Sequence, residues 1–176
     1  MTGSLNSSHT SPKKTTVLIV FFVVMVLWLI ADRCTKIVMD SGHTVGAYLG
    51  SPLPSVFDFR LVHNGGAAWG LFGGASIALG IGALIVSFCL IVFVCRRKPS
   101  SSSILLSVLA ALICAGGIGN AIDRLSLGYV VDFIEPTFIS FPVFNVADIG
   151  VTVGVALMFV YLLIEWRSEP SESERN

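Results

Sequence analysis

The chain has 176 residues, of which 54% are hydrophobic and only 12% are charged, and its formal net charge is zero. Soluble single domains rarely combine so much apolar sequence with so little charge. The composition therefore excludes an ordinary soluble domain and indicates an integral membrane protein. A spanning helix needs about 20 apolar residues, and four apolar segments stand out: Val17 to Ala31, Ala75 to Cys95, Ile104 to Ile122 and Val146 to Trp166.

The first apolar segment is short, and two lysines precede it, as in a secretory signal peptide. It ends in Asp32 and Arg33, however, where a cleavage site needs small residues. We therefore expect a retained spanning helix, lengthened by lysines that reach to the interface. Residues 1–15 are polar and predict a disordered tail, residues 16–166 a single four-helix domain, and residues 167–176 a second tail.

Asp32 and Lys36 follow the first segment at a spacing of four residues, so on a helix they share one face. This spacing predicts an ion pair. Two readings remain open for it, an interfacial pair that ends the helix and a direct role in a site.

The loop between the first two segments begins with an alternation of apolar and polar residues from Phe57 to Val62. Such alternation predicts a short strand with one apolar face. In the loop before the last segment, "YVVDFIEPTFISFPVF" is rich in β-branched and aromatic residues, and Pro136 and Pro142 limit any strand to an edge. We expect these loops to form a small sheet on the membrane surface.

The third segment ends in "GGIGNAIDRL", which places Asn120, Asp123 and Arg124 on one helix face. Arg124 beside Asp123 predicts a fixed, ionised carboxylate with a scaffold role. The glycines in this stretch and the G-x-x-x-G in the fourth segment permit close approach of a neighbouring helix or of a substrate. Two uses of these glycines remain open, packing of a neighbouring helix and, at Gly116 or Gly119, packing of a substrate helix.

Two carboxylates, Asp132 and Asp148, lie among apolar neighbours with no basic residue nearby in sequence. Desolvation and mutual repulsion are expected to raise at least one pKa, so that one carboxyl is protonated while the other is ionised. Aspartic proteases use this state to activate water against an amide. Asn145, one helical turn before Asp148, is placed to hold a carboxylate or the scissile carbonyl.

Other chemistries find less support. There is no H-E-x-x-H, no G-x-S-x-G and no P-loop, and the four cysteines form no C-x-x-C, so we expect no metal centre and no cofactor. A small transporter or channel remains an alternative, since intramembrane acids bind protons or cations. Its acids are expected deep in the helices rather than at their ends. A scaffold protein leaves the pair of aspartates unexplained.

Orientation follows from the cations beside the spans. One side receives the lysines and arginines at positions 13, 14, 96, 97, 98 and 167. We therefore expect that side, with both termini, to be cytoplasmic, and the two polar loops to lie outside.

The ordered motifs "DRCTK", "HNGGAAWG", "GGIGNAIDR", "YVVDFI" and "FNVAD" strongly resemble those of bacterial lipoprotein signal peptidase, also called signal peptidase II. The resemblance runs from Asp32 to Gly154. It implies an all-α membrane protein of four transmembrane helices, with a small extracytoplasmic sheet, the β-cradle, and a periplasmic helix. The implied activity is an aspartyl endopeptidase of the bacterial inner membrane.

This family removes signal peptides from diacylglyceryl-modified prolipoproteins, cutting just before the lipidated cysteine. The resemblance implies Asp132 and Asp148 as the catalytic pair, and further motif positions carry over as supporting or substrate-binding groups: Asp32, Lys36, Asn64, Gly66, Asn120, Asp123, Arg124 and Asn145. It also implies membrane lipid and globomycin-type inhibitors as partners. We expect a monomer and no nucleic-acid partner.

Overall fold

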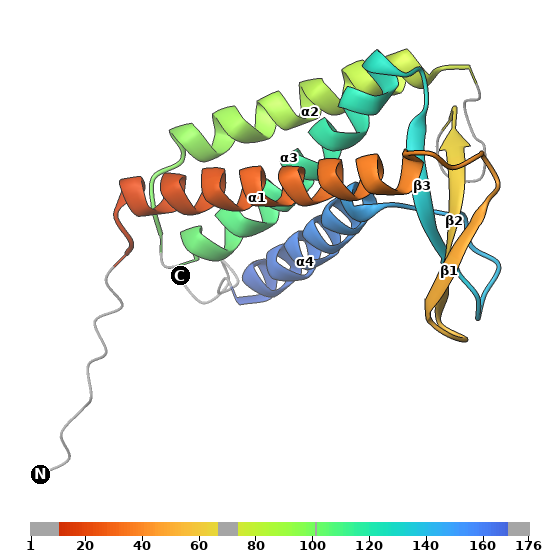
Figure 1. The fold of residues 1–176 in the computed structure, drawn as a ribbon. Coiled ribbons are helices and arrows are strands. Elements are labelled where there is room, and N and C mark those ends of the chain that lie inside the picture. The colour runs from red at the N-terminus through yellow and green to blue at the C-terminus, as the bar shows by residue number, and fades with distance from the viewer. Residues whose placement is uncertain (1–10, 67–73, 101, 169–176) are drawn as a thin grey trace, which may run out of the picture.

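The structure is a computed structural model, and it describes residues 11–66, 74–100 and 102–168. Four long helices form a bundle with a three-stranded sheet at one end (Figure 1). In chain order the elements are α1 (Lys14–Asp40), β1 (Tyr48–Leu53), β2 (Phe57–Asn64), α2 (Ser76–Arg96), α3 (Ser103–Ser126), β3 (Val130–Pro136) and α4 (Val146–Ser168). The four predicted spans are confirmed, because each of these helices is long and apolar enough to cross a membrane.

The first helix is longer than its apolar segment, since α1 continues for nine residues beyond Ala31. The reading in which the pair of Asp32 and Lys36 ends this helix is therefore wrong. Both side chains are buried, at 0% and 1% exposure, so the pair lies inside the protein and not at its surface. A helix of 27 residues is about 40 Å long. That length exceeds the hydrocarbon core of about 30 Å, so α1 projects beyond the bilayer toward the sheet.

Helix α3 lies at the centre of the bundle and packs against α1, α2 and α4. In its most apolar stretch 61% of residues are buried, against 17% in each of the other helices. The reason is the run of small residues in α3, which lets neighbours approach closely. The apolar core beside it consists of Phe21, Val94, Ala110, Ala111 and Cys114.

Two glycines of α3 lie against other helices. A Cβ atom at Gly116 would collide with the backbone oxygen of Ala147 in α4, and one at Gly119 would collide with the carboxylate of Asp32 in α1. Both faces are thus occupied within the bundle. The reading in which a substrate helix packs against Gly116 or Gly119 is wrong, and helix packing is the use that the structure makes of them.

The sheet is antiparallel in the order β1-β2-β3. The strand predicted from Phe57 is confirmed as β2, although burial does not alternate along it. Strand β3 is an edge strand that ends at Pro136, as a proline requires. The left-handed conformation of Gly128 (φ 84°) turns the chain from α3 into β3. Phe144 then pairs with Ile134 of β3, which brings the returning chain beside the sheet just before α4 begins.

Some predicted features fall outside the residues that the structure describes. Most of the two tails does so, as do residues 67–73, where "AAWGLFG" leads toward α2. Within the described ranges the helices are α1 to α4, and the expected periplasmic helix is not among them.

Candidate active site

Asp132 lies on β3 and is 2% exposed. Its two carboxylate oxygens accept hydrogen bonds from neutral amides, one from Nδ2 of Asn145 at 2.6 Å and one from Nδ2 of Asn64 at 3.0 Å. Asn64 is oriented in turn, because its side-chain oxygen accepts a bond from the backbone N–H of Gly66 at 3.0 Å. No cation contacts the Asp132 carboxylate directly among the described residues.

Asp148 lies in the first turn of α4. Its side chain accepts a bond from the backbone N–H of Asn145 at 3.2 Å, while its own N–H donates to the side-chain oxygen of Asn145 at 3.0 Å. This reciprocal pair is a capping box, with Asn145 at the N-cap and Asp148 three residues on. Nδ2 of Asn120 donates to the other carboxylate oxygen at 2.7 Å. Asn145 therefore holds both aspartates at once.

A cavity of about 390 Å³ opens onto both carboxylates, and we call it the dyad cavity. Its polar lining is completed by Asn64, Asn120 and Arg124. Nη2 of Arg124 donates to the backbone oxygen of Gly66 at 3.3 Å, which ties the loop after β2 to α3. The rest of the wall is mainly apolar and comes from β3, the segment before α4 and α4 itself: Val130, Phe141, Pro142, Val143, Phe144, Ile149, Thr152 and Val153.

The surroundings of Asp132 favour its protonated form. Burial raises the pKa of Asp132 to about 7, and the nearby charge of Asp148 adds to the rise. Hydrogen bonds from Asn64 and Asn145 and the more distant charge of Lys36 oppose the shift without cancelling it. A carboxyl with such a pKa is poised to hold or release a proton near neutral pH.

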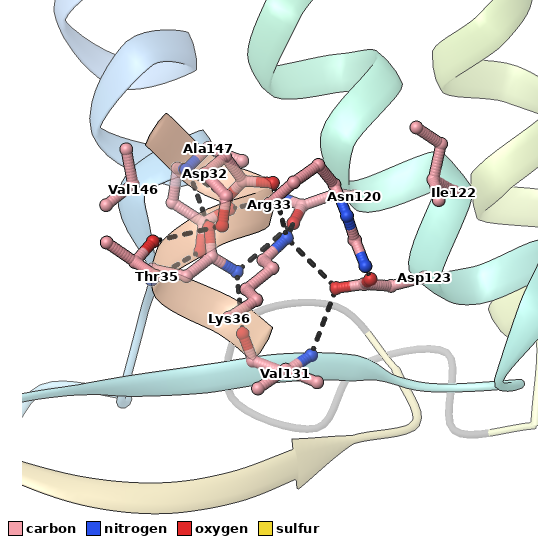
Figure 2. Close-up of polar contacts among 12 residues, drawn as sticks. Asp32, Arg33, Thr35, Lys36, Asn120, Ile122, Asp123, Val131, Val146 and Ala147 are labelled. Atoms are coloured by element: carbon pink, nitrogen blue, oxygen red, sulfur yellow. Dashed lines mark hydrogen bonds and ion pairs between the residues drawn. The ribbon is translucent and has the colours of Figure 1, made fainter. Parts of the chain in front are cut away.

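Beside the dyad cavity lies a buried group of charges that we call the ion cluster, formed by Asp32, Arg33, Lys36 and Asp123. Figure 2 shows Lys36 directed from α1 toward α3. Its ammonium lies 3.1 Å from Asp32 and 3.0 Å from Asp123, and it donates to the side-chain oxygen of Asn120 at 2.8 Å. The ammonium of Lys36 is thus surrounded by three oxygens, one each from Asp32, Asp123 and Asn120.

Asp123 is fully buried and is bridged by two cations, Lys36 and Arg33. The predicted partner, Arg124, is not one of them. Adjacent residues on a helix point in different directions, and Arg124 is directed instead to the dyad cavity and Gly66. The prediction that Arg124 pairs with Asp123 is therefore wrong. Asp123 is held in place, as predicted, but by two cations from α1 instead of by Arg124.

Three hydrogen bonds link the ion cluster to residues that hold or adjoin Asp132 and Asp148. Lys36 fixes the oxygen of Asn120, so the amide nitrogen of Asn120 is directed at Asp148. Asp123 accepts from the backbone N–H of Val131 at 3.3 Å, next to Asp132 in β3. Asp32 accepts from the N–H of Ala147 at 3.0 Å, next to Asp148 in α4 (Figure 2).

Comparison with known proteins agrees with this geometry. The sequence model of the family described as signal peptidase (SPase) II matches residues 24–164. The chain belongs to the signal peptidase II family. A lipoprotein signal peptidase of Enterococcus faecalis is 36% identical over 151 residues, which cover 86% of this chain and 92% of the relative. One of Symbiobacterium thermophilum is 36% identical over 145 residues, covering 81% and 93%.

A solved structure of a bacterial membrane enzyme superposes with a TM-score of 0.79 at 29% identity, covering 86% of this chain and 92% of the other. The predicted signal peptidase II family, peptidase activity of the aspartic type and processing of lipoprotein signal peptides are thereby confirmed. The multi-pass membrane fold is confirmed as well.

The contacts of two residues at this signal peptidase II site were not predicted from the sequence. Arg33 joins the ion cluster from α1, and its sequence position next to Asp32 gave no sign of a partner 90 residues away. The indole nitrogen of Trp28 donates to the backbone oxygen of Val146 at 3.1 Å, at the start of α4. A usable signal existed here, since Trp28 precedes Asp32 by four residues and a buried indole needs an acceptor. The described residues contain no group of three metal-ligating side chains.

Proposed function

We propose that Asp132 and Asp148 are the catalytic dyad of an aspartyl endopeptidase that cuts diacylglyceryl-modified prolipoproteins just before the lipidated cysteine. The observation that carries this proposal is the pair of carboxylates in one cavity, each held by neutral amides. Such carboxylates remain free to change their protonation state, which general acid–base catalysis requires.

The environments of the two carboxyls assign their roles. Asp132 carries the proton near neutral pH, because its pKa is raised to about 7. Asp148 is the partner that acts as the base, since both its oxygens accept from N–H donors and it lies at the positive end of α4. Asp148 takes a proton from the attacking water, and the protonated Asp132 donates to the scissile carbonyl and stabilises the oxyanion. The proton that Asp148 took from water then passes to the amine nitrogen of the cysteine as the C–N bond breaks. Asp132 recovers its own proton as the intermediate collapses to the new carboxyl group.

The supporting residues act through contacts already described. Asn145, Asn120 and Asn64 orient the dyad by their side-chain amides, and Gly66 holds Asn64. Arg124 lines the cavity within electrostatic reach of both aspartates. Asp32, Lys36 and Asp123 position these groups from behind and do not line the cavity.

The substrate lies along the apolar wall of the dyad cavity. Ile149, Thr152 and Val153 continue this wall along α4 from Asp148. Val153 is 41% exposed on the outside of the bundle, so the wall reaches the lipid-facing surface. This path lets an apolar signal helix and the acyl chains remain in the bilayer while the scissile bond reaches the dyad, and globomycin-type inhibitors would occupy the same cavity.

The orientation follows from the charges at the two ends of the bundle. The end opposite the sheet carries six cations in or beside the helix ends: Lys13, Lys14, Arg96, Arg97, Lys98 and Arg167. By the positive-inside rule this end is cytoplasmic. The sheet and the dyad then face the periplasm or the outer side of the bacterial inner membrane, and the enzyme works as a monomer in lipid.

The test is cleavage of a diacylglyceryl-modified prolipoprotein, and of its unlipidated form, by purified protein in detergent. Asp132→Asn and Asp148→Asn keep the shape of each side chain but cannot transfer the proton. Asp58→Asn, on the same sheet but outside the cavity, is the matched control. The proposal expects cleavage of the lipidated substrate only, by wild type and control. Turnover near the wild-type rate in either dyad variant would remove that aspartate from the mechanism.

A further inference from the structure

A second cavity, of about 190 Å³, lies at the end of the bundle away from the sheet, and we call it the sheet-distal cavity. All four helices contribute to its wall. Its interior is mainly apolar, and its members include Phe93, Leu106, Met158 and Leu162. Since Leu162 is 51% exposed on α4, this wall opens toward the surrounding lipid.

Two cations belong to the lining of the sheet-distal cavity, Lys14 at the start of α1 and Arg97 just after α2. The guanidinium of Arg97 lies over the ring of Phe93, 5.8 Å from its centre, which holds it at the cavity. Neither cation forms an ion pair with any residue that the structure describes. Their charges therefore remain available to a ligand.

The polar side chains near these two cations hydrogen-bond to other groups and do not neutralise the cations. Among the residues that the structure describes, none of those lining the cavity is acidic. The nearest acid along α4, Glu165, accepts a hydrogen bond from the hydroxyl of Tyr161 at 2.9 Å. The hydroxyl of Ser103 accepts from the N–H of Ser100 at 2.6 Å, and that of Ser107 donates to the oxygen of Ile104 at 2.7 Å.

An apolar groove with two unpaired cations at one end matches a molecule that has an anionic head and a hydrocarbon chain. Basic pockets between spanning helices bind the headgroups of anionic lipids in this way. We propose that the sheet-distal cavity binds an anionic phospholipid, with its phosphate at Lys14 and Arg97 and one acyl chain against Leu106 and Met158. This inference is independent of the peptidase mechanism, because the dyad lies at the other end of the bundle.

Charge favours this occupant over two others. The amino-terminal region of a signal peptide is itself cationic, so Lys14 and Arg97 repel it. A zwitterionic lipid fits the apolar wall equally well but has no net charge for the cations to attract. The carboxyl-terminal tail of this chain carries Glu169, Glu172 and Glu174 and is a third competitor, which the experiment includes.

The experiment counts bound lipids by native mass spectrometry of the purified full-length protein, with phosphatidylglycerol and phosphatidylcholine of identical acyl chains as probes. Wild type is expected to retain phosphatidylglycerol selectively. Each Lys or Arg near an anionic headgroup contributes a factor of about five in affinity. The double variant Lys14→Gln/Arg97→Gln should therefore bind about 25-fold more weakly.

The matched control is Arg96→Gln/Lys98→Gln, which removes two exposed cations at the same end but outside the cavity. It should keep most of the affinity. Equal losses in both double variants would show a diffuse surface attraction and overturn the site. Equal binding of phosphatidylcholine and phosphatidylglycerol by wild type would overturn the assignment of an anionic ligand.

The apolar part is tested separately with Leu162→Trp, which fills the groove from α4, against Leu163→Trp, which does not line it. Only the first should lose phosphatidylglycerol. Displacement of the lipid by a prolipoprotein, or tighter lipid binding after deletion of residues 169–176, would overturn the proposal in favour of the substrate or the tail. Cleavage should remain unchanged in all these variants because none contacts the dyad.

Discussion

The ion cluster and the dyad cavity each hold two aspartates, but the groups that contact the carboxylates differ in charge. In the cluster, Asp32 and Asp123 lie against ammonium and guanidinium groups. In the cavity, Asp132 and Asp148 are held by amide N–H groups. A cation in contact adds a positive charge beside the carboxylate, whereas an amide N–H orients the carboxylate without adding one. Under the proposed mechanism, the first pair of aspartates supports the structure and the second pair carries out the chemistry.

The largest expected effect compares Asp132→Asn with Asp123→Asn. The first variant should fold and lose about 100-fold to 10,000-fold in cleavage, because general acid–base catalysis contributes that much. The second should lose folded protein, since it leaves Arg33 and Lys36 with one buried carboxylate between them. Cleavage rate and melting temperature, measured on the same samples, separate the two. A stable, inactive Asp123→Asn would contradict the division of roles.

The next effect concerns the centre of the cluster. Lys36→Met fills a similar volume but leaves Asp32 and Asp123 buried without that ammonium, which should cost about 3–5 kcal/mol of unfolding free energy. Denaturant or thermal unfolding in detergent measures this loss. Lys98→Met, at an exposed position, serves as the control and should change stability little. Equal stability of the two variants would show that the cluster contributes nothing to folding.

The third prediction concerns how stability and cleavage depend on pH, which tests the environment of Asp132. The pKa of Asp132 in the folded protein, about 7, lies above its unfolded value of about 3.9, so the folded state binds more protons in between. Stability from this group therefore falls as pH rises from about 4 to about 7. The advantage in melting temperature of Asp132→Asn over wild type should grow from pH 5 to pH 8, and wild-type cleavage should decline above about pH 7. A constant difference across this range would argue against the raised pKa.

The smallest effect is expected at an ion pair that belongs to neither region. Arg60 and Glu135 pair at 2.6 Å across β2 and β3, but their side chains are 44% and 29% exposed. Exposed pairs contribute little to stability because water and salt screen them. Glu135→Gln should leave the melting temperature nearly unchanged and cleavage unchanged, because Glu135 does not line the dyad cavity. A large loss of cleavage would give Glu135 a role at the site.

The features that were predicted correctly from the sequence depend mostly on local patterns along the chain. Apolar segments marked the four helices to within a few residues at most ends, and spacing along one helix placed Lys36 beside Asp32. Strand β1 was missed because "YLGSPL" contains a glycine and a proline and shows no alternation. Its pairing with β2 decides its conformation, and that information is not local.

Contacts between distant segments were the part that could not be predicted. Arg33 meets Asp123 across 90 residues, and Trp28 meets Val146 across 118. The sequence offered Arg124 as a nearer partner for Asp123, and the direction of its side chain made that wrong. The absence of basic residues near Asp132 and Asp148 in the sequence still indicated the site. In the structure, amide N–H groups and not cations bind these two carboxylates.

The capping box of α4 also bears on the order in which the site assembles. Asn145 and Asp148 are three residues apart, so their mutual geometry has low contact order and forms with the first turn of the helix. Asp132 reaches the same place only when β3 docks beside β2, a pairing that spans about 70 residues. One half of the site is thus encoded locally and the other by topology. The two aspartates therefore come together only once the sheet and the helices have assembled.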